Sequence, residues 1–265
     1  MRKVLSAAIA LLVLISVTFS AGCGKSGGDR LEQVKKNGKI VIAMEGQWAP
    51  WTYHDESGAL VGYDTEVGQA IAKKLGVDAE FIEGEWDGLF VGLDSGKYDL
   101  IINGVEITDE RLEKYDFSTP YAYDSTVLIV TKNNTSVKTF ADLKGKTTSN
   151  SLGSTYADLA EANGATVSNV DTLAETISMI LSGRADATLN AETSFYDYMA
   201  EHPDENIMIV DKTAEASKIA IPIVKGDNNK ALVEAINKAI EELRADGTLK
   251  KLSEKYFGGD ISGSN

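Results

Sequence analysis

The chain has 265 residues, of which 43% are hydrophobic and 25% are charged. These globular values exclude a disordered, collagen-like or coiled-coil chain, and the length predicts about two domains. Forty acidic against 26 basic side chains give a formal net charge of −14, which disfavours nucleic-acid binding because neutralising phosphates requires clustered Lys and Arg. One cysteine excludes an internal disulfide and two histidines leave little for a histidine-rich metal site, so we expect no metal and no cofactor.

The first 22 residues have the pattern of an export signal. Arg2 and Lys3 form a basic start, and an almost unbroken apolar run follows over residues 7–19. That run is shorter than a bilayer-spanning helix requires, and it has the length of a signal-peptide core. No later apolar run is long enough to cross a membrane, so we expect an exported protein whose folded part lies outside the bilayer.

Cys23 follows three small residues at 20–22. The segment from Phe19 to Cys23 resembles a bacterial lipoprotein signal, except that Ser20 stands where that signal usually has leucine. The resemblance implies cleavage before Cys23, a lipid on its sulfur and a flexible tether over residues 23–30. We therefore expect anchoring at the outer face of the cytoplasmic membrane, or a periplasmic location; plain secretion with an incidental cysteine is the alternative.

Strand and helix patterns alternate after the tether. Val67, Ala70, Ile71 and Leu75 fall on one face of a helix that ends at Gly76. The β-α-β-α-β order of this region indicates a parallel sheet with helices on both faces. In chain order, the elements are a strand over 39–44, the helix ending at Gly76, a strand over 77–82, a helix from Leu89 to near Gly96, and a strand over 98–102.

The alternation repeats in the second half, which indicates two similar α/β lobes. Thr172 and Glu175 have the spacing of a capping box, and the helix that they open ends at Gly183. The expected elements are strands over 147–151, 166–170, 185–190 and 207–210, and helices over 155–162, 172–181 and up to about 200. A strand over 218–224 and helices over 230–245 and 249–257 complete the chain.

Ligands of open α/β sheets bind beyond the carboxyl ends of the strands, and the loops there carry informative residues. Trp48 and Trp86 can form flat apolar walls, and Arg111 has a guanidinium fork that matches a carboxylate. Ser154 and Thr155 follow a glycine at a helix start, where backbone N–H groups favour an anion. Together these residues could hold a zwitterion. Taken singly, each has a plainer interpretation: a core tryptophan, a solvated arginine, an N-cap.

Four ordered motifs identify a resemblance to the polar amino-acid-binding proteins of bacterial ABC importers, the family 3 solute-binding proteins. The resemblance covers about Leu31 to Ile261, and the cystine-binding branch is the most similar. The motifs are Gly62–Val67, Thr108–Arg111 with Tyr115–Tyr121, Ser182–Ala187 and Ala245–Leu249; Glu45-Gly46, Trp86-Asp87-Gly88 and the Tyr115–Tyr121 run point to the cystine-binding branch.

The resemblance implies a two-lobed periplasmic-binding-protein type II fold with a hinge and a central cleft. Lobe 1 would comprise residues 31–123 and 215–265, and lobe 2 residues 124–214, with crossings near Tyr123-Asp124 and 211–214. The implied partners are a free amino acid and the permease subunits of an ABC transporter, and we expect a monomer.

The resemblance also implies a role for eight ligand-binding positions. Arg111, with Ser154 and Thr155, would clamp the ligand's carboxylate, and the Gly104 carbonyl would accept from its ammonium, with Asn103 before it in the wall. Trp48 and Trp86 would form apolar walls, and Glu45 would touch the distal end of the ligand. Glu106 is the ninth candidate, at a position that departs from the family.

Two positions depart from the family pattern. Glu106 stands where the family usually has Ser or Thr, and Ala191 stands where it usually has an Asp that binds the ammonium. Because an unpaired buried ammonium is costly, Glu106 could replace the missing Asp from the opposite lobe. Glu192 is a second candidate, with its side chain expected to point away. The alternative is that Glu106 is a solvated acid and the ligand has no α-amino group.

Three classes of function fit these residues. A binding protein that delivers an amino acid to a permease requires no chemistry and is our prediction. A dehydratase-like enzyme on the same fold would need a perturbed acid or base, for which Glu106 and Glu192 are the candidates; His54 and His202 occupy polar loops where we expect surface positions. A receptor's sensing domain would need a fused signalling segment. These residues do not specify which amino acid is bound.

Overall fold

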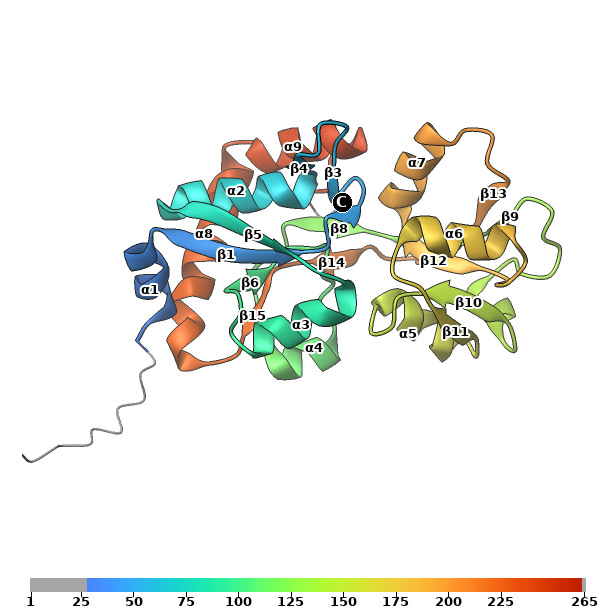
Figure 1. Ribbon diagram of the computed structural model, residues 1–265, viewed down its shortest axis with the longest axis horizontal. Coiled ribbons are helices and arrows are strands. Elements are labelled where there is room, and N and C mark those ends of the chain that lie inside the picture. Colours follow the sequence, from blue (N-terminus) through green and yellow to red (C-terminus); the bar gives the residue numbers. More distant parts are fainter. Residues whose placement is uncertain (1–27, 264–265) are drawn as a thin grey trace, which may run out of the picture.

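The structure is a computed structural model that describes residues 28–263. The signal sequence and Cys23 lie outside this part of the chain. Buried apolar side chains form separate cores in two lobes that lie side by side (Figure 1). The cores of lobe 1 draw on residues 34–122 and 219–252, and those of lobe 2 on residues 127–207. None of the helices in 28–263 is both long and apolar enough to cross a membrane.

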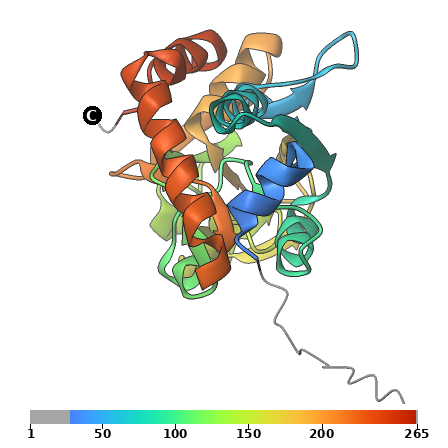
Figure 2. The ribbon, with the colours of Figure 1, turned by 90° about the vertical axis from the view of Figure 1, so that its left-hand side faces the viewer.

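Lobe 1 is built on a three-stranded sheet that is parallel, as predicted, and has the order β5-β1-β6. The side chains of β1 alternate between two cores: Ile42 packs with helices α2, α8 and α9, and Ala43 packs with α3 on the other face. Figure 2 shows α8 running beside α1. The elements are α1 (Arg30–Asn37), β1 (Lys39–Met44), α2 (Tyr63–Leu75), β5 (Asp78–Glu83), α3 (Trp86–Asp94), β6 (Leu100–Ile101), α8 (Lys230–Ala245) and α9 (Thr248–Phe257).

The start of the folded chain differs from the predicted tether. The Asp29 side chain caps α1 by accepting a hydrogen bond from the Glu32 backbone N–H, and Arg30 is the first residue of the helix. Arg30 Nε donates to Asp99 Oδ1 at 2.5 Å, which ties α1 to the residue before β6. Residues 29 and 30 are therefore part of lobe 1, because a cap and an ion pair hold them.

Lobe 1 also contains a small antiparallel sheet and a short helix that the sequence did not predict. Each of them places residues close to lobe 2. The sheet has the order β2-β3-β4, and Trp48 pairs with Thr52 in its register. The elements are β2 (Gln47–Trp48), β3 (Thr52–His54), β4 (Leu60–Val61) and α4 (Asp109–Lys114).

Lobe 2 repeats the alternation only in part. β10 and β11 pair in parallel, as predicted, but β12 and β13 both run antiparallel to the central β9. The capping box of Thr172 and Glu175 is formed at the start of α6. The elements are β9 (Thr126–Thr131), η1 (Phe140–Leu143), β10 (Thr147–Asn150), α5 (Thr155–Ala162), β11 (Thr166–Asn169), α6 (Leu173–Leu181), β12 (Thr188–Ala191), α7 (Glu192–Glu201) and β13 (Ile207–Lys212).

The strand predicted over 218–224 is two strands. β14 (Ser217–Ile219) pairs with β8 (Ala122–Asp124), and β15 (Pro222–Val224) pairs with β7 (Tyr115–Phe117). The residues between β7 and β8 include Pro120, which cannot donate a ladder hydrogen bond, so the pairing is interrupted. A one-turn helix, η2 (Asp227–Asn229), then leads into α8.

Candidate ligand-binding site

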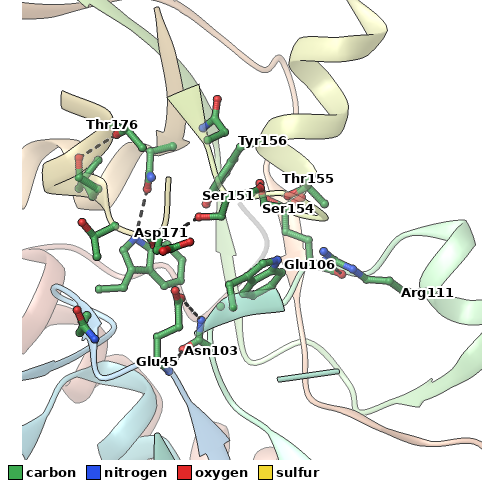
Figure 3. Close-up of a pocket in the computed structure, with 18 residues that line it drawn as sticks. Glu45, Asn103, Glu106, Arg111, Ser151, Ser154, Thr155, Tyr156, Asp171 and Thr176 are labelled. Carbon is green, nitrogen blue, oxygen red and sulfur yellow. Dashed lines mark hydrogen bonds between the residues drawn. The ribbon is translucent and has the colours of Figure 1, made fainter. Parts of the chain in front are cut away.

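All nine predicted ligand-binding residues line one cavity between the lobes (Figure 3). The space in the cavity that no protein atom fills is about 590 Å³, including the part that is open to solvent. The predicted lining residues are Glu45, Trp48, Trp86, Asn103, Gly104, Glu106, Arg111, Ser154 and Thr155, and nine others join them: Gln47, Asn150, Ser151, Tyr156, Asp171, Thr172, Leu173, Thr176 and Asn190. The sequence therefore predicted nine of the 18 residues that line this cavity.

Glu45 and Asn103 form a reciprocal pair at one end of the cavity (Figure 3). The Asn103 amide donates to Glu45 Oε2 at 2.6 Å, and its Oδ1 accepts from the Glu45 backbone N–H at 2.7 Å. Burial raises the pKa of Glu45 to about 7, with the Asn103 hydrogen bond opposing the shift and the negative charge of Asp171 adding to it. The cavity thus holds a carboxyl group that titrates near neutral pH.

Gly104 lets Trp48 lie flat against the backbone. Its φ is +55°, and a Cβ at this position would lie 2.5 Å from Trp48 Cζ3. The loop is fixed from behind by Asp64, which accepts the Gly104 N–H at 2.6 Å and the Tyr121 hydroxyl at 2.8 Å. Asp64 belongs to the motif over 62–67, so that motif supports the cavity wall without lining the cavity.

Arg111 points into the cavity as a desolvated cation. Its guanidinium donates to the backbone carbonyls of Glu106 at 2.9 Å and Gly153 at 3.2 Å, and its Cζ lies 5.4 Å from the ring centroids of both Trp86 and Phe90. Burial lowers its pKa. Among the described residues, the ion pairs do not include Arg111. A half-buried guanidinium without a carboxylate partner is the arrangement that an anionic ligand would complete.

Glu106 also faces the cavity, where its side chain is half-buried. Its backbone forms a bridge to Ile219 in β14, which places it beside a crossing strand. Burial raises the pKa of Glu106, whereas the polar side chains of Ser217 and Thr155 and the charge of Arg111 lower it.

The start of α5 presents backbone N–H groups to the cavity. The Ser154 hydroxyl accepts from the Ala157 N–H at 3.1 Å and donates to the Ser151 carbonyl at 2.6 Å, so the N-cap interpretation holds for its side chain. The Ser154 N–H donates to the Ser151 carbonyl at 3.2 Å, so a ligand would meet this helix start through the Thr155 N–H and the positive end of the helix.

Neither Ala191, which ends β12, nor Glu192, which begins α7, lines this cavity. Ala191 precedes α7, and Asn190 lines the cavity instead. Glu192 pairs with Lys212 Nζ at 3.1 Å, so its side chain points away, as expected. Asn190 is the last residue of a predicted strand, and that position was the available signal for it. His54 and His202 are both exposed.

Hydrogen bonds join the two lobes at three places among the described residues. Arg111 reaches the Gly153 carbonyl at 3.2 Å, Trp48 Nε1 reaches Asn190 Oδ1 at 3.2 Å, and Trp51 Nε1 reaches Thr193 Oγ1 at 3.1 Å. The lobes therefore lie in direct contact around the cavity. In residues 28–263 no group of three or more His, Cys, Asp or Glu side chains is arranged to hold a metal ion.

Residues 40–259 match the family of bacterial extracellular solute-binding proteins, family 3. The chain belongs to this family. It is 38% identical over 273 residues to the L-cystine-binding protein TcyA of Bacillus subtilis, a match that covers 99% of this chain and 100% of that protein. The predicted family and its cystine-binding-like character are confirmed.

Solved structures confirm the predicted two-lobed type II fold. An ancestral arginine-binding protein bound to arginine is 38% identical, with a TM-score of 0.77 over 83% of this chain and 99% of that chain. The L-cystine solute receptor of Neisseria gonorrhoeae in its unliganded open conformation is 41% identical, with a TM-score of 0.59 over 88% of this chain and 99% of that chain. The lower score against the open structure agrees with the contact between the lobes seen here.

Proposed function

We propose that this chain captures a free amino acid in the cavity between its lobes and delivers it to the permease of an ABC importer. The observation that carries the proposal is that two half-buried, opposite charges line the same cavity without forming an ion pair with each other: the Arg111 guanidinium and the Glu106 carboxylate. An amino acid would place its carboxylate at Arg111 and the start of α5, and its ammonium at Glu106 and the Gly104 carbonyl. Each charge would then have a partner away from water.

The balance of charge in the cavity favours a ligand with a second cationic group. Glu45, Glu106 and Asp171 face a single guanidinium, that of Arg111. A zwitterion neutralises only one of the three carboxylates. Arginine, which the name of one similar protein carries, brings a net positive charge at its distal end; cystine, which the name of another carries, brings a second ammonium together with a second carboxylate. We propose cystine or another polar amino acid of this kind, with Glu45 at its distal end.

The capture mechanism that we propose is closure of two rigid lobes about the crossing strands. The proposed limits are residues 31–123 and 215–265 for lobe 1 and 124–214 for lobe 2. The β8–β14 pair and the segment over 211–214 would act as the hinge, because they carry the chain between separate cores. The protein would act as a monomer, since each chain carries a complete cavity.

We also propose export and attachment to the membrane through a lipid on Cys23. The support is the basic start, the apolar run and the cysteine of the first 23 residues. Cys23→Ser should abolish lipid attachment and release the mature chain from membranes. Equal partition of the variant and the parent into the membrane fraction would remove the anchor and leave plain secretion.

A thermal-shift screen of the twenty amino acids and cystine tests the proposed function. At 100 times its Kd, a ligand should add about 2.7 kcal/mol to the free energy of unfolding. No stabilisation by any of them would overturn amino-acid capture. The stabilising compound should be recovered unchanged after long incubation, and its conversion to a product would support the dehydratase-like enzyme instead.

A further inference from the structure

Trp51 lies outside the ligand cavity, yet it joins the two lobes. Its ring is fully buried in lobe 1, stacked on Trp48 with centroids 5.4 Å apart and planes inclined by 12°, and set edge-on to Tyr63 at 5.7 Å. Its indole N–H donates to the Thr193 hydroxyl of lobe 2 at 3.1 Å. The lobe 1 core fixes the ring, so the acceptor for this N–H depends on where lobe 2 lies.

Thr193 connects Trp51 to Asp124, at the end of the crossing strand β8. Its hydroxyl donates to Asp124 Oδ2 at 2.6 Å, and its backbone N–H points to the same oxygen at 3.4 Å. The other carboxylate oxygen of Asp124 accepts the Ser125 N–H at 2.7 Å. The Thr193 hydroxyl uses its one proton to donate to Asp124 and a lone pair to accept from Trp51, so both hydrogen bonds can exist at the same time. Asp124 ends β8, where the chain enters lobe 2.

We infer that Trp51, Thr193 and Asp124 form a closure latch, a hydrogen-bonded chain that sets how readily the lobes stay together. Figure 1 shows α7, whose first turn holds Thr193, across from the β3 region of lobe 1. This inference rests on the proposed function, because closure matters only if a ligand is enclosed. The three residues do not line the cavity, so they act on the ligand through lobe position and are positioning residues.

The latch should change the affinity of every ligand by the same factor. A protein that closes less readily binds each ligand more weakly in proportion to the lost closed population. A residue of the cavity wall, in contrast, discriminates between ligands by the groups that it touches. Thr193→Val keeps the shape of the side chain but leaves the Trp51 N–H and the Asp124 oxygen without this partner in the closed state. We expect ligand binding to weaken about 5- to 100-fold.

The test measures the Kd of L-cystine and of L-arginine by calorimetry for the parent, Thr193→Val and Thr193→Ser. Thr193→Ser is the matched control, because it retains the hydroxyl and should bind within about threefold of the parent. Small-angle X-ray scattering of each protein, with and without ligand, reports the separation of the lobes. Thr193→Val should be more open than the parent at equal ligand concentration, and Thr193→Ser should restore closure.

Three outcomes would overturn the latch. One is an unchanged affinity in Thr193→Val, and another is a loss that differs more than tenfold between the two ligands. The third is a Thr193→Ser variant that behaves like Thr193→Val, which would indicate a packing role for the methyl group. If neither amino acid binds the parent, the proposed ligand class fails, and the scattering of the ligand-free proteins decides alone: equal lobe separation in the parent and Thr193→Val then rejects the latch.

Discussion

The Asn103 side chain forms two hydrogen bonds with Glu45: it donates to the carboxylate at 2.6 Å and accepts from the backbone N–H at 2.7 Å. The side chain of Asn103 is fully buried, so the pair is fixed from the lobe 1 side of the cavity. A neutral carboxyl and a carboxylate can both accept the amide N–H, and the pair therefore tolerates either state of Glu45. Proton binding at Glu45 then changes the charge of the cavity without changing its shape.

This pair predicts a pH-dependent stability of the ligand-free protein. The pKa of Glu45 is raised from its usual 4.5 to about 7, so the folded chain holds this proton more tightly than the unfolded chain. Its contribution is fully present below pH 4.5 and is lost as the pH rises through 7. The full shift corresponds to about 3 kcal/mol, and partial exposure to the cavity reduces the expected value to about 1–3 kcal/mol.

Urea unfolding of the parent and Glu45→Gln at pH 5 and pH 8 measures this term. Relative to the parent, the variant should gain about 1–3 kcal/mol of unfolding free energy between the two pH values, because Gln stays neutral. Glu85→Gln is the matched control, since Glu85 is exposed and makes no capping hydrogen bond. A constant difference between Glu45→Gln and the parent across this range would contradict the prediction.

Local patterns predicted most of the elements that position the cavity. The helical spacing before Gly76, the capping box at Thr172 and the strand over 39–44 all depend on residues close in sequence, and the structure confirms them. The same holds for the loops at the carboxyl ends of the strands, because parallel strands deliver their loops to one edge. Nine lining residues followed from that rule and from the family motifs.

The parts that local patterns missed depend on contacts between distant segments. β12 runs antiparallel to β9, and nothing near residue 190 specifies that direction. The buried Asp64 holds Gly104 across 40 positions. The break between β14 and β15 follows from their separate partners, β8 and β7. Sequence periodicity reports burial and does not report which strand is the neighbour.

Arg111→Ala should weaken amino-acid binding about 30- to several thousand-fold. The reason is the loss of a desolvated cation that would pair with the ligand's carboxylate, an effect of about 2–5 kcal/mol. Calorimetry with the stabilising amino acid measures it. Arg184→Ala serves as a control, because Arg184 is exposed and donates to Ser182 on the surface of lobe 2. A change below fivefold in Arg111→Ala would remove this residue from the site.

Gly104→Ala should damage both stability and binding. A left-handed backbone costs a residue with a Cβ about 1–2 kcal/mol, and displacing Trp48 adds about 1–3 kcal/mol. Gly153→Ala is the matched variant: its φ is +71° and its Cβ would meet no atom within 4 Å. Urea unfolding should show a loss of about 2–5 kcal/mol for Gly104→Ala and about 1–2 kcal/mol for Gly153→Ala. Equal losses in the two variants would mean that displacing Trp48 does not change the free energy of unfolding.

Glu106→Gln tests the departure of this chain from its family. Gln keeps an oxygen that can accept from the Ser217 and Thr155 hydroxyls, and it removes the charge. If Glu106 is the partner of the ligand's ammonium, binding of the amino acid should weaken by about 2–5 kcal/mol. An analogue without the α-amino group should lose little or bind more tightly. Glu192→Gln, which changes an acid paired with Lys212 outside the cavity, should alter neither Kd.

Returning the acid to the position that the family uses gives the sharpest form of this test. Glu106→Thr combined with Ala191→Asp should recover part of the affinity that Glu106→Thr loses, because both side chains would then serve the same ammonium. Calorimetry of the parent, the two single variants and the double variant, each with the amino acid and its deaminated analogue, measures the coupling. Independent positions would give additive changes. Should Glu106→Gln bind the amino acid as tightly as the parent does, the ligand's amine must be held elsewhere or be absent, and the half-buried Glu106 would then serve the α5 terminus alone.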